Sequence, residues 1–351
     1  MKKGIWIIAA LICVLGVTVI SFASINSGLF VRDKILEEHA EDIKKTKVDV
    51  KEQISIKDEK TPADINIIQS KKIADDGSMI FEVVNNGKVM GSFYYKPWLE
   101  NRPVFTKLEN GDFILGKTMY YSTKEQVLKP LAGEVNLSIF DYDVLGNKVA
   151  LIGKQDKNNE AIMKVFIYNI ETKEYAEVDS FKYPNYMHQE TVLLCWKSNE
   201  ELFYDYCEGT KPLIKSYNTH NGDKKVFMDS AMNPQISPQG NYMVLLKISS
   251  LNKSDRTIDE LQLVDVSKKE KITKVNGSKK IFWHDDLLFV KNMDEAVIEV
   301  LDCKAGGKKI KSIPMADMPV EIKVSNNNVK IKSYKFNEGM ITLNEVDEAL
   351  K

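Results

Sequence analysis

Cysteine is scarce in this sequence, with four residues among 351. Cys13 lies in an apolar N-terminal run, and the other three, Cys195, Cys207 and Cys303, are too widely spaced for a disulfide scaffold or a CxxC zinc site. We expect these three to be thiols. A bond between Cys195 and Cys207 remains an alternative, because geometry and not spacing decides whether a disulfide forms.

Motifs for catalysis and metal binding are missing as well. The four histidines form neither an H-E-x-x-H motif nor a pair at ligand spacing, and there is no G-x-S-x-G nucleophile elbow. Asp141 and Asp143, followed by Asn147, lack the acidic residue that completes a calcium loop, so we interpret them as turn residues. We therefore expect no metal and no cofactor, and the sequence favours a binding module over an enzyme.

An excess of one charge is also absent. The chain carries 49 basic and 50 acidic residues, for a formal net charge of -1. A nucleic-acid-binding domain would show a basic footprint, so nucleic acid is not an expected partner.

The N-terminus contains the one long apolar run. Met1-Lys2-Lys3 precedes the uncharged residues Gly4 to Ala23, which are enough to cross a bilayer as a helix. We predict a transmembrane signal anchor over 1–24, with a cytoplasmic N-terminus and the rest of the chain outside the cell membrane. Ser21 and Ala23 are also compatible with a cleaved signal peptide.

A charged stretch follows, in which Lys, Glu and Asp alternate from Arg32 to Lys60. Apolar residues recur every seven positions, at Leu29 just before this stretch and at Leu36, Ile43 and Val50 within it. This stripe is one residue wide, so the stretch is a solvated spacer or a weak coiled coil. We predict a charged stalk or linker over 25–62.

The remainder of the chain repeats a turn that opens an apolar strand. The turns are Asp76-Gly77, Asn110-Gly111, Gly146-Asn147, Ser198-Asn199, Gln239-Gly240, Asp285-Asp286 and Asn326-Asn327. Their spacing averages about forty residues, the period of a four-stranded propeller blade. The first unit is short, because Asp76-Gly77 and Asn85-Asn86-Gly87 lie close together, and both turns can belong to one blade.

A second landmark alternates with the first. It is an apolar or aromatic residue followed by Asn or Asp, a polar turn and lysines, and it occurs at Tyr168-Asn169, Tyr217-Asn218, Val264-Asp265 and Leu301-Asp302, with weaker copies at Val84-Asn85, Tyr121-Ser122 and Leu343-Asn344. The small polar side chain can close an Asx turn between two outer strands.

These residues resemble a known family. Ser237-Pro238-Gln239-Gly240-Asn241-Tyr242 is similar to the S-P-D-G turn of TolB-like propeller repeats, with Gln239 in place of Asp, and the second landmark resembles the L-x-V-x-D turn of such blades. The resemblance covers most of Ile73 to Val346. It implies an extracytoplasmic propeller that binds other proteins, and it carries no catalytic residues across.

We therefore predict an all-β fold, a six- or seven-bladed β-propeller over 63–347, preceded by the transmembrane helix and the stalk. Strands near Ile65 to Ile68 are expected to pair with the last blade and close the ring, because an open sheet edge is a liability. Trp196 and Trp283 precede turns at the same place in the repeat, which favours packing within blades over ligand stacking.

Two irregular connections place proline beside aromatic residues, and they supply the predicted partner-binding residues Trp98, Arg102, Tyr183, Tyr186 and His188. Trp, Tyr and Arg are frequent anchors of protein interfaces. The alternative is that these rings pack on the blade edges.

We predict a membrane-anchored, extracytoplasmic propeller that acts as a protein-binding or scaffold module at the cell envelope, with a protein or cell-wall partner. One alternative is an envelope glycan hydrolase or lyase that uses carboxylates at the propeller channel. A second is a ligand-sensing domain coupled to a membrane partner.

Overall fold

The chain separates into two compact units, residues 1–53 and 54–351. The computed structural model describes residues 65–74, 78–96, 100, 102–157, 160–183, 193–251, 256–315, 317, 319–337 and 340–350, all of which belong to the second unit. The predicted anchor (1–24) and stalk (25–62) lie outside the described residues. Within the described part, no helix has the length and apolar character needed to span a membrane.

The described residues form seven antiparallel sheets. The first three contain β1 (Ile65–Ile73), β2 (Met79–Asn85) and β3 (Lys88–Tyr95); β4 (Phe105–Lys107), β5 (Phe113–Leu115), β6 (Met119–Ser122) and β7 (Val127–Pro130); and β8 (Ser138–Leu145), β9 (Lys148–Lys157), β10 (Glu160–Asn169) and β11 (Glu174–Lys182). The fourth and fifth contain β12 (Leu194–Trp196), β13 (Glu201–Glu208), β14 (Lys211–Asn218) and β15 (Lys224–Asp229); and β16 (Ala231–Ile236), β17 (Tyr242–Leu251), β18 (Arg256–Asp265) and β19 (Glu270–Val275). The sixth and seventh contain β20 (Ile281–His284), β21 (Leu287–Asn292), β22 (Val297–Asp302) and β23 (Lys308–Pro314); and β24 (Pro319–Ser325), β25 (Asn328–Asn337) and β26 (Met340–Ala349).

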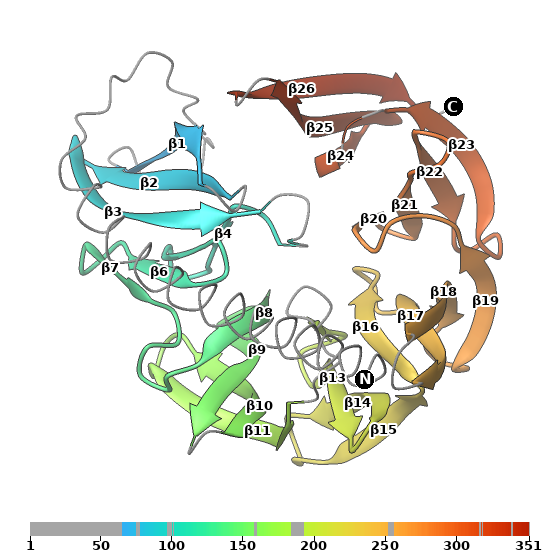
Figure 1. Cartoon of the computed structure of the whole chain (residues 1–351), viewed down its shortest axis with the longest axis horizontal. Coiled ribbons are helices and arrows are strands. Elements are labelled where there is room, and N and C mark those ends of the chain that lie inside the picture. Colours follow the sequence, from blue (N-terminus) through green and yellow to red (C-terminus); the bar gives the residue numbers. More distant parts are fainter. Residues whose placement is uncertain are drawn as a thin grey trace, which may run out of the picture. The chain divides into compact units, whose positions relative to one another are not determined.

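Each sheet is an antiparallel meander, and the sheets follow one another in chain order around a common axis (Figure 1). In the sheets β8–β11 and β16–β19, the first strand lies nearest the axis and the last lies at the rim. Neighbouring sheets pack against each other, for example through β8 with β12 and through β20 with β24. This arrangement is a β-propeller, and its seven sheets agree with the larger of the two predicted blade numbers.

The second strand of most sheets is buried on both faces. Residues 149–152, 202–204, 243–245 and 288–290 are all apolar or aromatic and have no solvent-exposed area. Successive side chains of a strand point to opposite faces, so a continuous apolar run is stable only where a neighbouring sheet covers each face. Each Val, Leu, Ile, Phe or Met side chain among them contributes about 1.5–3 kcal/mol on burial, and stacking the sheets around an axis gives every one of them a covered position.

The turns match the chemistry predicted for them. Gly240 has a φ of 74°, and its amide donates to the Ser237 carbonyl at 2.8 Å. The Ser237 Oγ accepts a hydrogen bond from the Tyr242 amide at 3.1 Å as β17 begins. A glycine is favoured at this position because a side chain strains the left-handed conformation.

The second landmark forms the predicted Asx turns between third and fourth strands. The Oδ1 of Asn169 accepts from the amides of residues 171 and 172 at 2.9 and 3.2 Å. Asn218 and Asp265 make the same pair of bonds, and Asp302 accepts from the Ala305 amide at 3.2 Å. This prediction is therefore confirmed at the four best copies.

Two predictions about the ends of the ring are wrong. Strand β1 pairs with β2 in its own sheet, so Ile65 to Ile68 do not add a strand to the last sheet, although β1 contacts β26. Leu343-Asn344 lies inside β26 and forms no turn. Both predictions rest on a local sequence pattern, whereas long-range packing decides which strands pair. The prediction that the first two turns share one blade is confirmed, since β1, β2 and β3, which flank both turns, form one sheet.

Candidate functional site

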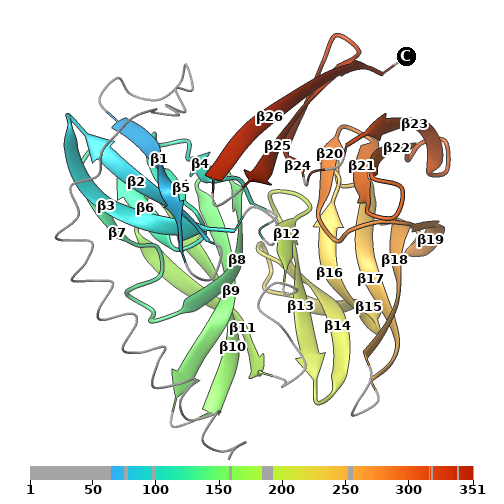
Figure 2. The same cartoon turned by 45° about the horizontal axis from the view of Figure 1, so that its top comes forward.

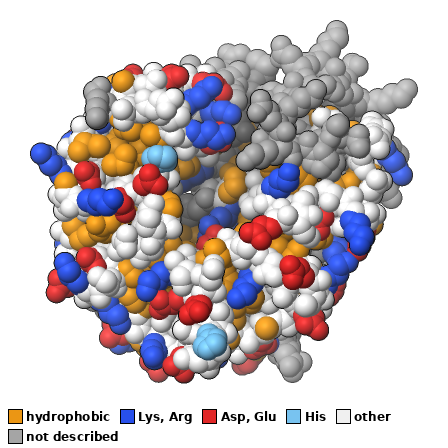
Figure 3. Space-filling view, turned by 180° about the vertical axis from the view of Figure 1, so that it is seen from behind, with side chains coloured by type: hydrophobic (Ala, Val, Ile, Leu, Met, Phe, Trp, Pro, Cys, Tyr) orange, Lys and Arg blue, Asp and Glu red, His pale blue; other side chains and the backbone are white. Residues whose placement is uncertain are grey.

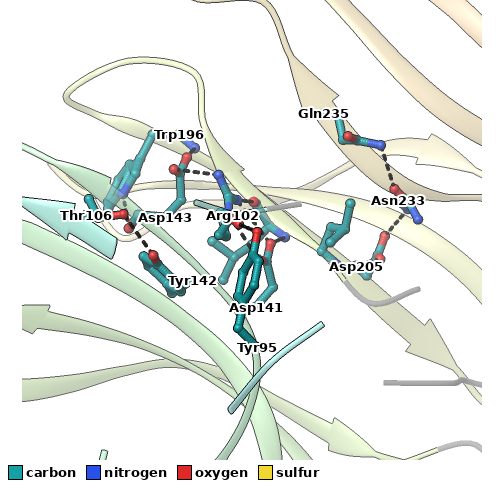
Figure 4. Close-up of polar contacts among 12 residues, drawn as sticks. Tyr95, Arg102, Thr106, Asp141, Tyr142, Asp143, Trp196, Asp205, Asn233 and Gln235 are labelled. Carbon is teal, nitrogen blue, oxygen red and sulfur yellow. Dashed lines mark hydrogen bonds and ion pairs between the residues drawn. The ribbon is translucent and has the colours of Figure 1, made fainter. Parts of the chain in front are cut away.

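Arg102 lies in the connection from β3 to β4, and its guanidinium reaches two carboxylates of the third sheet (Figure 4). Its Nε and Nη2 donate to the Asp141 oxygens at 3.0 and 3.1 Å, and its Nη1 donates to Asp143 Oδ1 at 2.9 Å. Asp141 and Asp143 are two residues apart on β8, so the strand period places both on the same face. One planar guanidinium therefore bridges two acids held in register.

The same carboxylates also bind the backbone of β12 in the next sheet. The Leu194 amide donates to Asp141 Oδ2 at 3.1 Å, and the Trp196 amide donates to Asp143 Oδ2 at 2.8 Å. Arg102 Nη2 donates to the Leu194 carbonyl at 2.7 Å. The innermost strands of the third and fourth sheets are thus joined by charge-assisted hydrogen bonds, which are stronger than neutral ones.

A third acidic residue continues the chain of contacts. Asp205, on β13, has no exposed surface and accepts from the amides of Leu193 and Asn233 at 2.9 and 2.7 Å. Asn233 Oδ1 accepts from Gln235 Nε2 at 3.0 Å, and the same Nε2 donates to the Lys279 carbonyl at 2.9 Å. Polar bonds therefore link the fourth sheet to the fifth, and the fifth to the connection that leads into β20.

Aromatic hydroxyls extend the contacts toward the first two sheets. Tyr95 Oη donates to the Arg102 carbonyl at 2.8 Å, which fixes the connection to the end of β3. Thr106 Oγ1 and Tyr142 Oη lie 2.8 Å apart, and the Tyr142 ring centre is 5.9 Å from the Arg102 Cζ. We call the whole set, Tyr95, Arg102, Thr106, Asp141, Tyr142, Asp143, Asp205, Asn233 and Gln235, the inner polar network.

In this network, burial and neighbouring charges shift the pKa values of the ionisable groups in opposite directions. Burial lowers the pKa of the Arg102 guanidinium, but the carboxylates of Asp141 and Asp143 outweigh it and raise that pKa above its usual value. Burial raises the pKa of the Asp143 carboxyl, and Arg102 only partly offsets the rise. Burial also holds the pKa of Asp205 well above its usual range, against the two backbone donors.

The chemistry open to these acids is limited by their bonds. Both oxygens of Asp141, Asp143 and Asp205 accept hydrogen bonds from groups of the protein itself. A general acid or base needs an oxygen within reach of a substrate proton. These carboxylates therefore hold sheets together, and the earlier interpretation of Asp141 and Asp143 as turn residues is wrong, because both lie inside β8.

Glu100 and Lys280 differ from those acids. Glu100 Oε1 accepts from the Lys96 amide at 3.3 Å, whereas the buried Oε2 has no hydrogen-bond partner. Burial raises the pKa of Glu100, and the nearby Lys117 and Lys280 partly offset this rise. Burial lowers the pKa of Lys280 to about 8, with Glu100 opposing the fall. Figure 3 shows that the rear face of the ring is hollowed near its middle, with acidic and basic side chains around the hollow.

The predicted partner-binding residues are only partly described. Trp98, Tyr186 and His188 lie outside the described residues. Arg102 belongs to the inner polar network, and Tyr183 directly follows β11, with its ring packed edge-on against Phe140 at a centroid distance of 5.8 Å. Partner binding at these five positions remains a prediction.

Several other side chains have a packing role. Trp196 is 6% exposed, and Trp283 packs against the largest apolar cluster, as predicted for both. Cys195, Cys207 and Cys303 are buried thiols. Among the described residues, no group of three or more His, Cys, Asp or Glu side chains is placed to hold a metal ion.

Sequence reasoning missed the inner polar network. The Arg102 partners lie 39, 41 and 92 positions away along the chain, and no local pattern reports such contacts. One signal was available, because Asp205 interrupts the aromatic run of β13 and a charge in a buried strand must find partners.

Comparisons with known proteins give similarities of fold. No protein-family model and no curated protein matches the sequence. Among solved structures, an oligogalacturonate lyase in complex with manganese is 10% identical, with a TM-score of 0.46, 82% of this chain covered and 86% of that chain. A catalytically inactive virginiamycin B lyase from Staphylococcus aureus is 11% identical (TM-score 0.45; 84% and 97% covered), and the β-propeller domain of the Trilobed protease from Pyrococcus furiosus is 13% identical (TM-score 0.47; 83% and 95% covered). The assignment of the propeller rests on the seven sheets themselves.

Proposed function

We propose that this chain is a membrane-anchored, extracytoplasmic β-propeller that binds a protein partner at the cell envelope. The observation that carries the proposal is the hydrogen bonding of the three acids in the inner polar network. Every carboxylate oxygen of Asp141, Asp143 and Asp205 accepts a hydrogen bond from the protein itself. These bonds join neighbouring sheets, as expected for a rigid scaffold. The apolar run Gly4 to Ala23 supports the anchor, and the resemblance to TolB-like repeats supports a protein partner.

Exposed apolar side chains on two neighbouring sheets support a contact surface at the rim. Val89 and Tyr94 on β3 are 54% and 48% exposed, and Val127 on β7 is 44% exposed. β3 and β7 are in contact. The predicted anchor Trp98 comes three residues after Tyr95, the last residue of β3, so one partner can contact both the strand end and the connection after it. Aromatic residues of this kind are frequent energetic anchors of interfaces.

Crosslinking in intact cells tests the proposal. A photoreactive amino acid is placed at Trp98, at Tyr186 or at Tyr94, and captured proteins are identified by mass. The matched control is Met293, which is 58% exposed on the turn between β21 and β22. We expect the same partner from at least two of the three positions and none from Met293. Capture from Met293 alone would refute the choice of surface.

A second candidate is favoured by Glu100 and Lys280. Burial raises the pKa of the Glu100 carboxyl and lowers that of the nearby Lys280 to about 8, and general acid–base catalysis uses groups whose pKa values are shifted in these directions. The corresponding function is the hydrolysis or lyase cleavage of an envelope glycan. The acid of this candidate site is Glu100, which does not belong to the inner polar network.

A paired assay separates the two functions. Cell-wall glycans are incubated with the purified chain and with Glu100→Gln and Lys280→Met, and new reducing ends or unsaturated products are measured. Product that disappears in both variants, while crosslinking persists, would establish the enzyme. If the parent protein yields no product and the crosslinks are retained, the binding function stands alone.

A further inference from the structure

Four Asn-Gly dipeptides occur in the sequence, at Asn86-Gly87, Asn110-Gly111, Asn221-Gly222 and Asn276-Gly277. All four lie among the described residues, and all four asparagines are exposed. An asparagine before glycine loses its side-chain amide readily, because glycine has no Cβ to hinder the approach of the next backbone nitrogen. The four sites share this chemistry, so they differ only in the contacts that hold them.

The reaction begins when the backbone nitrogen of the glycine attacks the asparagine Cγ. The new C–N bond closes a succinimide ring, and the side-chain nitrogen leaves as ammonia with the proton of the glycine amide. Water then opens the ring: attack at Cγ gives aspartate, whereas attack at the backbone carbonyl carbon gives isoaspartate, in which the main chain runs through Cβ. A folded protein slows the first step wherever the reacting groups must first leave other contacts.

Two of the sites hold the asparagine side chain. Asn110 Nδ2 donates to Asp112 Oδ2 at 2.7 Å, and Asn110 Oδ1 accepts from the Asp112 amide at 3.0 Å. Asn221 makes the same two bonds with Asp223, at 3.2 and 3.0 Å. In both cases the amide that would react is fixed by the aspartate two positions further on.

The attacking nitrogens of these two sites are bonded as well. The Gly111 amide donates to the Leu108 carbonyl at 3.0 Å. The Gly222 amide donates to the Asn218 carbonyl at 2.9 Å. The glycine nitrogen can reach Cγ only after the backbone has left this bond, so three hydrogen bonds hold each site.

The third site is held by packing at its glycine. A Cβ placed on Gly277 would lie 2.6 Å from the Lys291 carbonyl oxygen, so the backbone here is packed closely against β21. The next amide, that of Ser278, donates to the same carbonyl at 2.8 Å. Rotation of the backbone at Asn276 would break this contact.

The fourth site has neither restraint. Asn86-Gly87 is the two-residue turn between β2 and β3, which lie side by side in Figure 2. Both residues are exposed, and nothing lies within 4 Å of the Cβ position of Gly87. Within the part of the chain that the structure describes, neither the Asn86 side chain nor the Gly87 amide makes a hydrogen bond.

The backbone of this turn also favours opening. Asn86 has a φ of 47° and Gly87 a φ of 75°, the left-handed conformations of a type I′ turn. Such a conformation is strained for any residue that carries a Cβ. The tip can rotate once the end pair Asn85–Lys88 has separated, and the rest of the hairpin stays paired.

We propose that Asn86 is a site of spontaneous deamidation and isomerisation, and that in the folded chain it reacts faster than the other three asparagines. Water is the only co-reactant. The isoaspartate product adds a methylene to the main chain of a two-residue turn, and the length of that turn sets the pairing register of β2 and β3. The site does not depend on the proposed function, but it lies beside the proposed contact surface, because Val89 and Tyr94 are on β3.

A comparison of four rates within one protein tests the proposal. The full chain in detergent is kept at mildly alkaline pH, and samples are digested with trypsin at intervals. Lysines separate the four dipeptides into different peptides, in which mass spectrometry measures the replacement of an amide by a carboxyl group. We expect Asn86 to react at least about tenfold faster than Asn110 and Asn221, since no set of three hydrogen bonds has to open first.

Asn276 should also react more slowly than Asn86. An Asn86 rate no higher than that of any of the other three sites would overturn the proposal.

The unfolded chain supplies the control. In urea the folded contacts are lost, so each folded rate is divided by the rate of the same peptide in urea. If Asn86 reacts in urea but keeps its amide in the folded chain over the same time, the turn protects it and the proposal is wrong.

Asp223→Ala tests the reason for the ranking. This variant removes the acceptor of Asn221 Nδ2 at an exposed turn and leaves the β2–β3 hairpin as it is. The rate at Asn221 should rise about fivefold, and the rate at Asn86 should not change. An unchanged rate at Asn221 would show that these side-chain bonds do not protect asparagine, and would overturn the inference.

The proposed function is tested separately by crosslinking from Tyr94. If fresh protein captures no partner from Tyr94, that choice of surface fails, and the ranking of the four deamidation rates is unaffected.

Discussion

Charged side chains are placed differently in two regions of the ring. On the side of the second to fifth sheets, Arg102 acts with the buried Asp141 and Asp205 and the partly exposed Asp143, and their hydrogen bonds join innermost strands across sheet boundaries. Within the last sheet, the charged pairs lie on the outside, as with Lys332 on β25, which reaches Glu321 on β24 and Glu345 on β26 at 3.1 and 3.8 Å. Charged groups thus join neighbouring sheets near the axis in the first region, whereas in the last sheet they pair at the surface.

The difference matters because burial changes the cost of losing a partner. A buried charge left alone costs several kcal/mol, whereas an exposed ion pair contributes roughly 0–1 kcal/mol. Mutations on the two sides should therefore differ in effect, even where the number of bonds removed is the same.

The largest difference is expected from matched removal of one cation. Arg102→Met leaves Asp141 and Asp143 facing each other with only backbone donors, and we expect a loss of roughly 3 to 4 kcal/mol in the free energy of unfolding. Lys332→Met should cost less than about 1 kcal/mol, because Lys332 and its partners are each about a third exposed or more. Urea unfolding followed by tryptophan fluorescence measures both. Equal losses would mean that Arg102 in the inner polar network contributes no more to the free energy of unfolding than a surface lysine does.

Two glycines sharpen the comparison through the backbone. A Cβ on Gly153, in β9, would lie 2.3 Å from the Ser138 carbonyl oxygen, so Gly153→Ala must push β8 away from β9 and should cost about 2 to 3 kcal/mol. Gly87, in the first sheet, has a φ of 75° and nothing within 4 Å of its Cβ position, so Gly87→Ala should cost only the backbone strain of about 1 kcal/mol. Thermal unfolding of the two variants ranks them, and the reverse order would contradict the packing described for β8 and β9.

The pH dependence of stability tests how dry the region around Lys280 is. Its folded pKa of about 8 lies below the usual 10.5, so between these values the unfolded chain binds more protons than the folded one. Stability from this lysine therefore rises as the pH increases from 8 to 10, by about 2 kcal/mol. Burial raises the pKa of the Cys303 thiol to about 12, which acts in the opposite direction above pH 9.

The measurement is consequently a difference between two proteins. The free energy of unfolding is determined at several pH values for the parent chain and for Lys280→Met, which keeps Cys303 and all other groups. The parent should gain stability relative to the variant as the pH rises. Parallel curves would show that the ammonium of Lys280 is well solvated.

The smallest effect is expected at an Asx turn. Asn218 Oδ1 accepts from the amides of His220 and Asn221 at 2.9 and 3.2 Å, and Asn218→Ala should cost about 1 kcal/mol. Lys225→Ala, seven positions on and in no turn, serves as the control and should be neutral within the error of urea unfolding. An equal loss of stability in the Lys225 and Asn218 variants would contradict a stabilising role of the Asx turn.

What could be predicted from the sequence was local. Turn residues such as Gly240 and Asn218 carry their own hydrogen bonds, so their pattern revealed the repeat, the all-β class and the place of the outer turns. Strand β1 shows where this reasoning fails: its apolar residues can pair with any neighbour, and only the packed ring decides for β2.

The inner polar network could not be predicted for the same reason. Arg102 stands in an irregular connection where arginine suggests an exposed anchor, yet its partners come from two other sheets. Asp141 and Asp143 look like turn residues because they precede Gly146-Asn147. Their real function depends on a strand register that the sequence does not report.

The long reach of Arg102 also has a consequence for synthesis. The carbonyl that completes its set of acceptors belongs to Leu194, 92 positions later in the chain. A ribosome adds about 5–20 residues per second, so a nascent polypeptide carries this cation without its last acceptor for roughly 5 to 20 s. The strand that carries Asp141 and Asp143 is therefore synthesised several seconds before the strand whose amides and carbonyl complete this set of hydrogen bonds.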